Sequence, residues 1–144
     1  MLKSFNHLLV PLDFTTGNDA VLSVVDELVG EQKLRISLIH VVEPIEADDD
    51  PKTQSFTENL TQQAGQKLQQ RADQLKHLNA EVVCENRLGK RHVEVIAYAR
   101  DQSVDLILLN SHLISPDEPA SKMFSLSYQI ALMAPCAVMM LKQG

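Results

Sequence analysis

Five short apolar runs recur along the chain and constrain its fold more than any other feature. They are FNHLLVPLD (residues 5–13), RISLIHVV (35–42), AEVVCEN (80–86), VDLILLN (104–110) and CAVMMLK (136–142). Several of these runs are continuously apolar rather than alternating, which is typical of strands that are covered on both faces. A sheet built from such strands requires helices above and below it.

Helical periodicity fills the segments between these runs. Apolar residues recur every three or four positions in residues 18–29, 55–77, 91–102 and 121–134. This spacing predicts four amphipathic helices, and in the third it places Val93, Ile96 and Ala97 on the apolar side. In the second segment Ser55 and Glu58 have the spacing of a capping box, so we expect that helix to begin at Ser55. The order βαβαβαβαβ predicts one domain over residues 1–144, with an α/β fold in which helices cover both faces of an open five-stranded parallel sheet.

The acidic composition excludes several classes of partner. The 144 residues carry a net charge of -6, with 22% charged and 44% hydrophobic residues. Nucleic acids and anionic membranes attract basic surfaces, so we expect neither as a partner. No apolar stretch reaches about 18 residues and the N-terminus lacks a small-residue cleavage site, which predicts a cytoplasmic protein. Cys84 and Cys136 lie in apolar runs without metal-type spacing and are expected to be reduced thiols.

Catalytic and metal-binding patterns are weak in this chain. The acidic run over residues 43–50 invites a calcium interpretation, but an EF-hand loop would need Gly and Glu where Thr53 and Asn59 stand. We therefore expect an exposed acidic loop and no metal site. Ser111 and His112 could form a nucleophile and base, yet neighbouring residues of an extended segment point in opposite directions. No catalytic residue is predicted, and we expect the protein not to be an enzyme.

The loop after the fourth apolar run is the most informative segment for function. Parallel sheets bind ligands beyond the carboxyl ends of their strands, at the point where the strand order reverses. Here the chain reads NSHLISPDEPASKMFS over residues 110–125, without a glycine. Ser115 and Glu118 have capping-box spacing, and Pro119 suits a first helical position. The acidic side chains of this loop would complement the N-terminus of the next helix themselves and would repel a phosphate.

Four segments together resemble the universal stress protein family over nearly the whole chain. They are LLVPLDFTTGNDAVLSVVDEL (8–28), SLIHVVEP (37–44), RLGKRHVEVIAYARDQSVDLILLNSH (87–112) and APCAVMML (134–141). The resemblance implies a Rossmann-like five-stranded sheet, a cytoplasmic location and homodimers. It also implies two branches. One binds ATP through a Gly-x-x-Gly pair after the fourth strand and a later Gly-Ser or Gly-Thr, and the other lacks these glycines and holds no nucleotide detectably.

Other residues stand at the positions that match the family's phosphate-binding glycines. Asn110 to Leu113 occupy the place of Gly-x-x-Gly, and Phe124–Ser125 occupies the place of Gly-Ser with one residue more in between. Glycine lets consecutive N–H groups converge on an anion, whereas Leu113 or Phe124 would fill the space of the phosphates. This degenerate motif predicts a member of the non-nucleotide branch, with no cofactor.

Binding of ATP or AMP through an atypical loop is the alternative. For that case the family pattern implies contacts from Pro11, Leu12, Asp13, Val41, Asn110, Ser111, Leu113 and Ser125. Asp13 matches the family's aspartate at the adenine or ribose, and Val41 matches a backbone contact to the base. Both have simpler interpretations, because Asp13 can cap the first helix or its loop and Val41 can be a buried strand residue.

The last apolar run provides the predicted interface. An exposed edge strand pairs with another chain unless it is covered, and the family commonly dimerises through this strand. The expected dimer edge is Ala137, Val138, Met139, Met140 and Leu141. The alternative is an edge covered by the protein's own helices. The sequence thus predicts a dimeric stress-response or regulatory module with an unidentified protein partner. An ATP- or AMP-binding stress sensor or weak ATPase is the second reading, and a hydrolase using Ser111 or His112 is the third.

Overall fold

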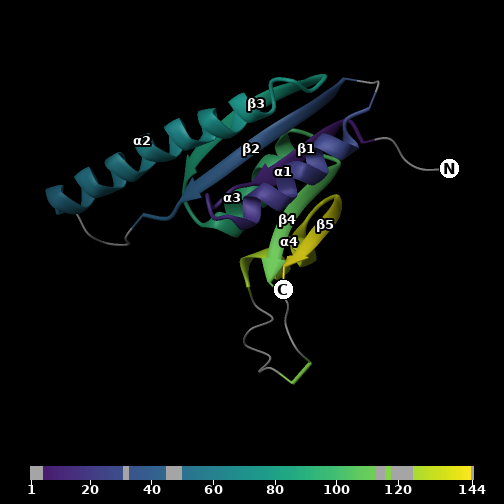
Figure 1. Ribbon diagram of the computed structural model, residues 1–144. Helices are drawn as coiled ribbons and strands as arrows, with labels where there is room; N and C mark the ends of the chain where they lie inside the picture. The colour runs from purple at the N-terminus through teal and green to yellow at the C-terminus, as the bar shows by residue number, and fades with distance from the viewer. Residues whose placement is uncertain (1–4, 31–32, 45–49, 113–115, 118–124, 144) are drawn as a thin grey trace.

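The structure is a computed structural model that describes residues 5–30, 33–44, 50–112, 116–117 and 125–143. Its elements are β1 (His7–Pro11), α1 (Gly17–Leu28), β2 (Leu34–Val42), α2 (Pro51–Gln74), β3 (Ala80–Leu88), α3 (Arg91–Asp101), β4 (Leu106–His112), α4 (Leu126–Met133) and β5 (Ala137–Gln143). The strands form one parallel sheet in the order β3-β2-β1-β4-β5 (Figure 1). The predicted α/β architecture is therefore confirmed.

Two cores lie on opposite faces of this sheet, and successive residues of each strand alternate between them. Leu8 and Val10 pack with residues of α1 and α2 in one core, whereas Leu9 packs with residues of α3 and α4 in the other. This two-sided burial explains why the strands are continuously apolar. Among the described residues, no helix is both long and apolar enough to cross a membrane.

The second helix begins earlier than the capping-box pattern predicts. It starts at Pro51, and the Asp50 carboxylate accepts a hydrogen bond from the Lys52 N–H at 3.0 Å. An aspartate cap followed by proline at the first helical position is also a helix start signal, and the helix uses this earlier one, so the prediction at Ser55 was wrong. The first turns of α2 project beyond the strands (Figure 1), and the side chain of Phe56 is 56% exposed.

The buried face of α3 also differs from the predicted one. Val95, Tyr98 and Ala99 are buried, whereas Val93, which was expected inside, is 47% exposed. Apolar residues occur on more than one side of this helix, so periodicity alone does not decide which side meets the sheet. Val95 packs near the carboxyl ends of the strands, where it lines a cavity.

A buried hydrogen-bond chain links β1, β2 and α3. The His7 ring donates from Nδ1 to the Gln102 carbonyl at 3.0 Å, which leaves Nε2 to accept the Ser37 hydroxyl at 2.6 Å. The Ser37 oxygen in turn lies 2.8 Å from the Tyr98 hydroxyl. Burial lowers the pKa of His7 from its ordinary value, with the Gln102 hydrogen bond opposing this effect, so the neutral ring fits the site.

Both cysteines are half-buried rather than deep in the core. The Cys84 thiol donates toward the Leu68 carbonyl at 3.6 Å, and burial raises the pKa of Cys84. A raised pKa disfavours the reactive thiolate, which agrees with the expectation of an inert reduced thiol at Cys84.

Candidate ligand pocket at the strand switch point

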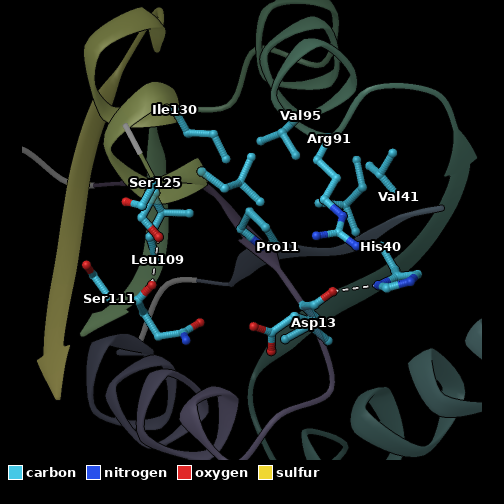
Figure 2. Close-up of a pocket in the computed structure, with 15 residues that line it drawn as sticks. Pro11, Asp13, His40, Val41, Arg91, Val95, Leu109, Ser111, Ser125 and Ile130 are labelled. Carbon is cyan, nitrogen blue, oxygen red and sulfur yellow. Dashed lines mark hydrogen bonds between the residues drawn. The ribbon is translucent and has the colours of Figure 1, made fainter. Parts of the chain in front are cut away.

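A cavity of about 330 Å³ opens beyond the carboxyl ends of β1, β2 and β4, with α3 and α4 on its other side (Figure 2). The strand order reverses between β1 and β4, so the cavity lies where the topology predicts a ligand site. It is lined by Pro11, Leu12, Asp13, Ile39, His40, Val41, Arg91, Val95, Leu109, Asn110, Ser111, Ser125, Leu126, Ser127 and Ile130. Its volume is at the lower end of the range for small-molecule sites.

Seven of the eight residues predicted to contact a nucleotide line this cavity. They are Pro11, Leu12, Asp13, Val41, Asn110, Ser111 and Ser125. The eighth, Leu113, lies outside the described residues, as do Phe124 and the expected cap residues Ser115 and Glu118. The segment Arg87 to Gly89, where β3 ends, does not line the cavity, and the Arg87 guanidinium pairs with Glu85 and Glu94 instead.

A fully buried amide, Asn18, joins the two strands that flank the switch point. Its Oδ1 accepts hydrogen bonds from the backbone N–H groups of Asp13 at 3.1 Å and Phe14 at 2.7 Å. Its Nδ2 donates to the Asn110 Oδ1 at 3.1 Å. Sequence analysis missed Asn18, although a polar residue in register with the apolar stripe of α1, one turn before Val21, could have indicated a buried polar contact.

The Asp13 carboxylate stabilises the loop between β1 and α1. Its Oδ1 accepts from the backbone N–H of Thr15 at 2.9 Å and from the Thr15 hydroxyl at 2.6 Å. The helix itself begins after Thr16, which makes no side-chain cap. Of the two simple interpretations of Asp13, the loop cap is the one found. The adjacent Phe14 has a φ of 63°, an uncommon backbone conformation for an aromatic residue.

The polar groups where β4 meets α4 bond to one another. The Ser127 hydroxyl donates to the Asn110 carbonyl at 2.8 Å. The Ser125 hydroxyl accepts from the Tyr128 N–H at 3.5 Å and caps α4. With the amide of Asn18 on the Asn110 side chain, three side chains at this end of the cavity are engaged within the protein. Among the described residues at this end, the Asn110 and Ser125 oxygens and the Ser127 hydroxyl are therefore not available to a ligand without loss of these bonds.

His40 forms the opposite, outer side of the cavity. Its Nδ1 lies 2.7 Å from the Leu12 carbonyl, which can only accept, so Nδ1 carries the proton and Nε2 is an acceptor in the neutral ring. Its ring packs on Phe14 with centroids 4.5 Å apart, and Lys67 Nζ lies 5.5 Å from the centroid of Phe14. Burial lowers the pKa of His40, and the charge of Arg91 acts in the same direction.

Arg91, the first residue of α3, supplies a positive charge to the same side. Its backbone N–H donates to a carboxylate oxygen of Glu43 at 3.0 Å. Figure 2 shows its side chain extending from the helix across the cavity toward Pro11 and His40. Arg91 was not among the predicted site residues, because the approach of α3 to this region is a tertiary effect.

No metal site was found, since the described residues contain no cluster of three or more histidine, cysteine or acidic side chains that could hold an ion. Thr53 and Asn59, the positions that an EF-hand loop would have to use, both lie within α2. Ser111 is buried and lines the cavity, while the His112 side chain is not among the described groups.

The chain is similar to known proteins in both sequence and fold. The sequence model of the universal stress protein family matches residues 4–142. The solved structure of hypothetical protein MJ0577 is similar, with a TM-score of 0.84 at 19% identity over 99% of both chains. The universal stress protein UspA from Lactobacillus plantarum has a TM-score of 0.76 at 20% identity, over 97% of this chain and 99% of its own.

A third structure, a universal stress protein in complex with cAMP, has a TM-score of 0.72 at 10% identity, over 97% of this chain and 98% of its own. At these identities the structural likenesses show the fold alone, and the match to the family rests on the sequence model. No curated protein sequence matches the chain significantly.

Proposed function

The chain belongs to the universal stress protein family, and we propose that it is a dimeric, non-catalytic regulatory module whose pocket does not hold ATP. Its output would pass through a protein partner that recognises the dimer. The observation that carries this proposal is the self-contained hydrogen bonding at the β4–α4 end of the pocket, where nucleotide-binding members have glycines by the resemblance noted above.

ATP binding would require hydrogen-bond donors and space for the phosphates at the β4–α4 end of the pocket. Asn110 accepts from Asn18 and from Ser127, so both of its oxygens are occupied within the protein. Its side chain occupies volume that a glycine would leave open to a phosphate oxygen. The net charge of -6 also opposes the binding of a triphosphate. An anion site needs free N–H groups and room for the anion, whereas the described residues at this end of the cavity present an asparagine side chain and two hydroxyls that are already engaged.

We propose that the protein has no catalytic activity because of where Ser111 lies. Ser111 is buried at 5% exposure, and it lies on β4, where consecutive side chains point to opposite faces of the sheet. A nucleophile and its base must lie within hydrogen-bond reach of each other, which adjacent strand positions do not favour.

The proposed dimer uses β5, an edge strand that pairs only with β4 among the described strands (Figure 1). Along it, Met139 packs toward the core of α1 and α2, while Val138 and Met140 pack toward the core of α3 and α4. All three remain half-buried in the single chain, and Ala137 is exposed. A second copy would cover these side chains and the open backbone edge.

Light scattering tests the dimer. Wild-type protein should have about twice the 16.1 kDa chain mass. Met139→Lys and Ala137→Arg should both be monomeric, with Lys52→Ala, on the far end of α2, as a dimeric control. Because Met139 also contacts the core, a melting curve must accompany its result, whereas Ala137 is exposed and needs no such allowance. A dimer that survives Ala137→Arg would refute the β5 interface.

The second candidate function is a sensor of AMP-like nucleotides. One observation favours it: the cavity lies at the strand switch point, and a universal stress protein of the same fold was solved with cAMP. In that case the base would lie near Asp13 and Val41. The β4–α4 end of the cavity, where the polar groups bond to one another, disfavours a triphosphate more than a monophosphate. Binding of ATP and of AMP therefore distinguishes the two candidate functions.

Isothermal titration with ATP and AMP is the deciding experiment. The proposal predicts no ATP heat at protein concentrations of about 0.1 mM, corresponding to a Kd weaker than about 1 mM. A variant with Asn110→Gly, Leu113→Gly and Phe124→Gly should gain ATP affinity if the missing glycines are the cause. Micromolar ATP binding by the wild type would eliminate the proposal, and micromolar AMP binding without ATP binding would favour the sensor.

A further inference from the structure

The cavity has its charge and its apolar surface at different ends. The side chain of Arg91 reaches the outer end, beside His40 (Figure 2). Among the described residues no carboxylate lies within ion-pair distance of the Arg91 guanidinium, and Glu43 bonds to the backbone N–H of Arg91 rather than to its side chain. A guanidinium that faces a cavity without a carboxylate partner is suited to an anionic group of a ligand.

His40 gives the same end a second polar contact. Because Nδ1 is held by the Leu12 carbonyl, the ring is fixed in place and its Nε2 is the remaining polar atom. The ring is further supported by its packing on Phe14. A protonated Nε2 would donate to an anion held by Arg91, and a neutral one would accept from a protonated acid.

Two carboxylates near this end are already engaged. Asp13 Oδ1 accepts from the N–H and the hydroxyl of Thr15. A carboxylate oxygen of Glu43 accepts the first N–H of α3. Glu43 thereby caps the helix N-terminus, so the anion site rests on the Arg91 side chain and not on the helix end.

The inner end of the cavity is apolar. Val95 and Ile130 are buried side chains from α3 and α4, and Leu109 and Ile39 come from the strands below them. All four belong to a single core cluster, so this wall is pre-formed by the fold. The polar groups nearby, on Asn110 and Ser127, bond to each other and do not require a ligand.

We infer that the cavity binds a small amphipathic anion, with its acidic head at Arg91 and His40 and a flat apolar body against Val95 and Ile130. This orientation places the charge at the α3 end, opposite to the β4–α4 end where a nucleotide of this family would place its phosphates. The inference deepens the proposed function by giving the regulatory module a small-molecule input. It rests on the pocket being free of ATP.

Anilinonaphthalene sulfonate is a suitable probe, because it carries one permanent negative charge on an apolar ring system and fluoresces when its rings leave water. Its neutral relative phenylnaphthylamine has the same rings without the acid. Wild-type protein should bind the sulfonate with one site per chain. Arg91→Gln should weaken that binding roughly tenfold or more, the scale of one charge-assisted hydrogen bond, and should leave phenylnaphthylamine unchanged.

Two control variants locate the site. Lys90→Gln removes a neighbouring exposed cation that does not line the cavity, and it should leave sulfonate binding within about twofold of wild type. Leu126→Trp adds bulk at a half-buried lining position and should abolish binding of both probes in a variant that still folds by circular dichroism. Equal sulfonate affinity in wild type and Arg91→Gln would overturn the inference. So would unchanged binding in Leu126→Trp, or equal loss of both probes in Arg91→Gln.

The pH dependence of sulfonate binding provides an independent readout. The charged groups that face His40 are Asp13 in the β1–α1 loop, Lys67 on α2 and Arg91 on α3. The pKa of His40 is lowered, so the affinity should rise as the pH falls below about 6.5, because the sulfonate stays charged and the ring gains a proton. His40→Gln should remove this rise, and a rise that persists in His40→Gln would assign it elsewhere and contradict the role of His40.

The proposed function and this inference fail in different ways. An ATP titration run alongside the probes would detect nucleotide binding, which would refute the proposed function whatever the probes do. If ATP does not bind and the sulfonate binds equally well to wild type and Arg91→Gln, only the inference of an amphipathic anion is refuted, and the proposed regulatory module stands.

Discussion

Replacement of Asn18 by alanine should destabilise the protein more than its position in the first turn of a helix suggests. The amide is completely buried and makes three hydrogen bonds, to the N–H groups of Asp13 and Phe14 and to the Asn110 Oδ1. It is the polar link between the loop after β1 and the end of β4. Without it, two backbone donors and one amide oxygen lose their partners.

The magnitude follows from how far water can replace those partners. Each hydrogen bond contributes about 1 kcal/mol net, so three contribute about 3 kcal/mol. Asp13 is exposed and its N–H can bond to water, while Phe14 and Asn110 are half-buried. Alanine also has a helix propensity about 0.5 kcal/mol better than asparagine. We therefore expect a loss of about 2 kcal/mol in the free energy of unfolding.

Urea denaturation followed by circular dichroism measures this loss, with the slope of the transition expected to stay the same. Thr16→Ala is the matched control, because Thr16 lies in the same turn, is exposed, and makes no side-chain cap. The control should change the free energy by less than about 0.5 kcal/mol. A loss in Asn18→Ala no larger than that of the control would refute the account of Asn18 as a link between the two strands.

Other predictions concern a buried histidine and a helix cap. Because the pKa of His7 is lowered in the fold, its stabilising contribution is complete above about pH 6.5. The contribution is lost as the pH falls below that value, by at most about 1.4 kcal/mol per pH unit. The difference in unfolding free energy between wild type and His7→Gln should therefore shrink as the pH falls below about 6.5. Tyr98→Phe removes the hydroxyl group that hydrogen-bonds to Ser37 and should cost about 1 kcal/mol in the same assay. Asp50→Ala should cost about 1 kcal/mol because it removes the cap of α2, whereas Ser55→Ala should be nearly neutral, and the reverse order would contradict the observed helix start.

Sequence reasoning predicted the architecture because the relevant signals are local and repeated. Continuous apolar runs such as those around Leu8 and Leu108 indicate strands covered on both faces, and their alternation with helical segments specifies a parallel sheet. The carboxyl ends of the strands then indicate a ligand site. Pro11, Asp13 and Asn110 line the cavity for that reason.

The residues that sequence reasoning missed depend on tertiary contacts. Arg91 reaches the cavity because α3 packs through Val95, and the apolar pattern of α3 favoured Val93 instead. Asn18 is buried because two loops converge on it, a contact between residues 92 positions apart in the case of Asn110. Such contacts leave little periodic trace, so only a buried polar residue in an apolar stripe could have signalled them.

Helix boundaries were the other weak point, for a different physical reason. Ser55 and Glu58 do have capping-box spacing, but Asp50 followed by Pro51 provides a preceding start that the helix uses. Two competing local signals of similar strength cannot be ranked without knowing how far the helix extends beyond the sheet. The exposed Phe56 marks that extension.

Native mass spectrometry of the gently purified protein tests the central claim most directly, since it weighs the chain together with whatever it holds. The account predicts a dimer of about twice 16.1 kDa, without ATP or AMP. The same spectrum would show a small amphipathic anion if one copurifies. ATP at close to one molecule per chain would contradict the claim that the self-bonded end of the pocket excludes a triphosphate.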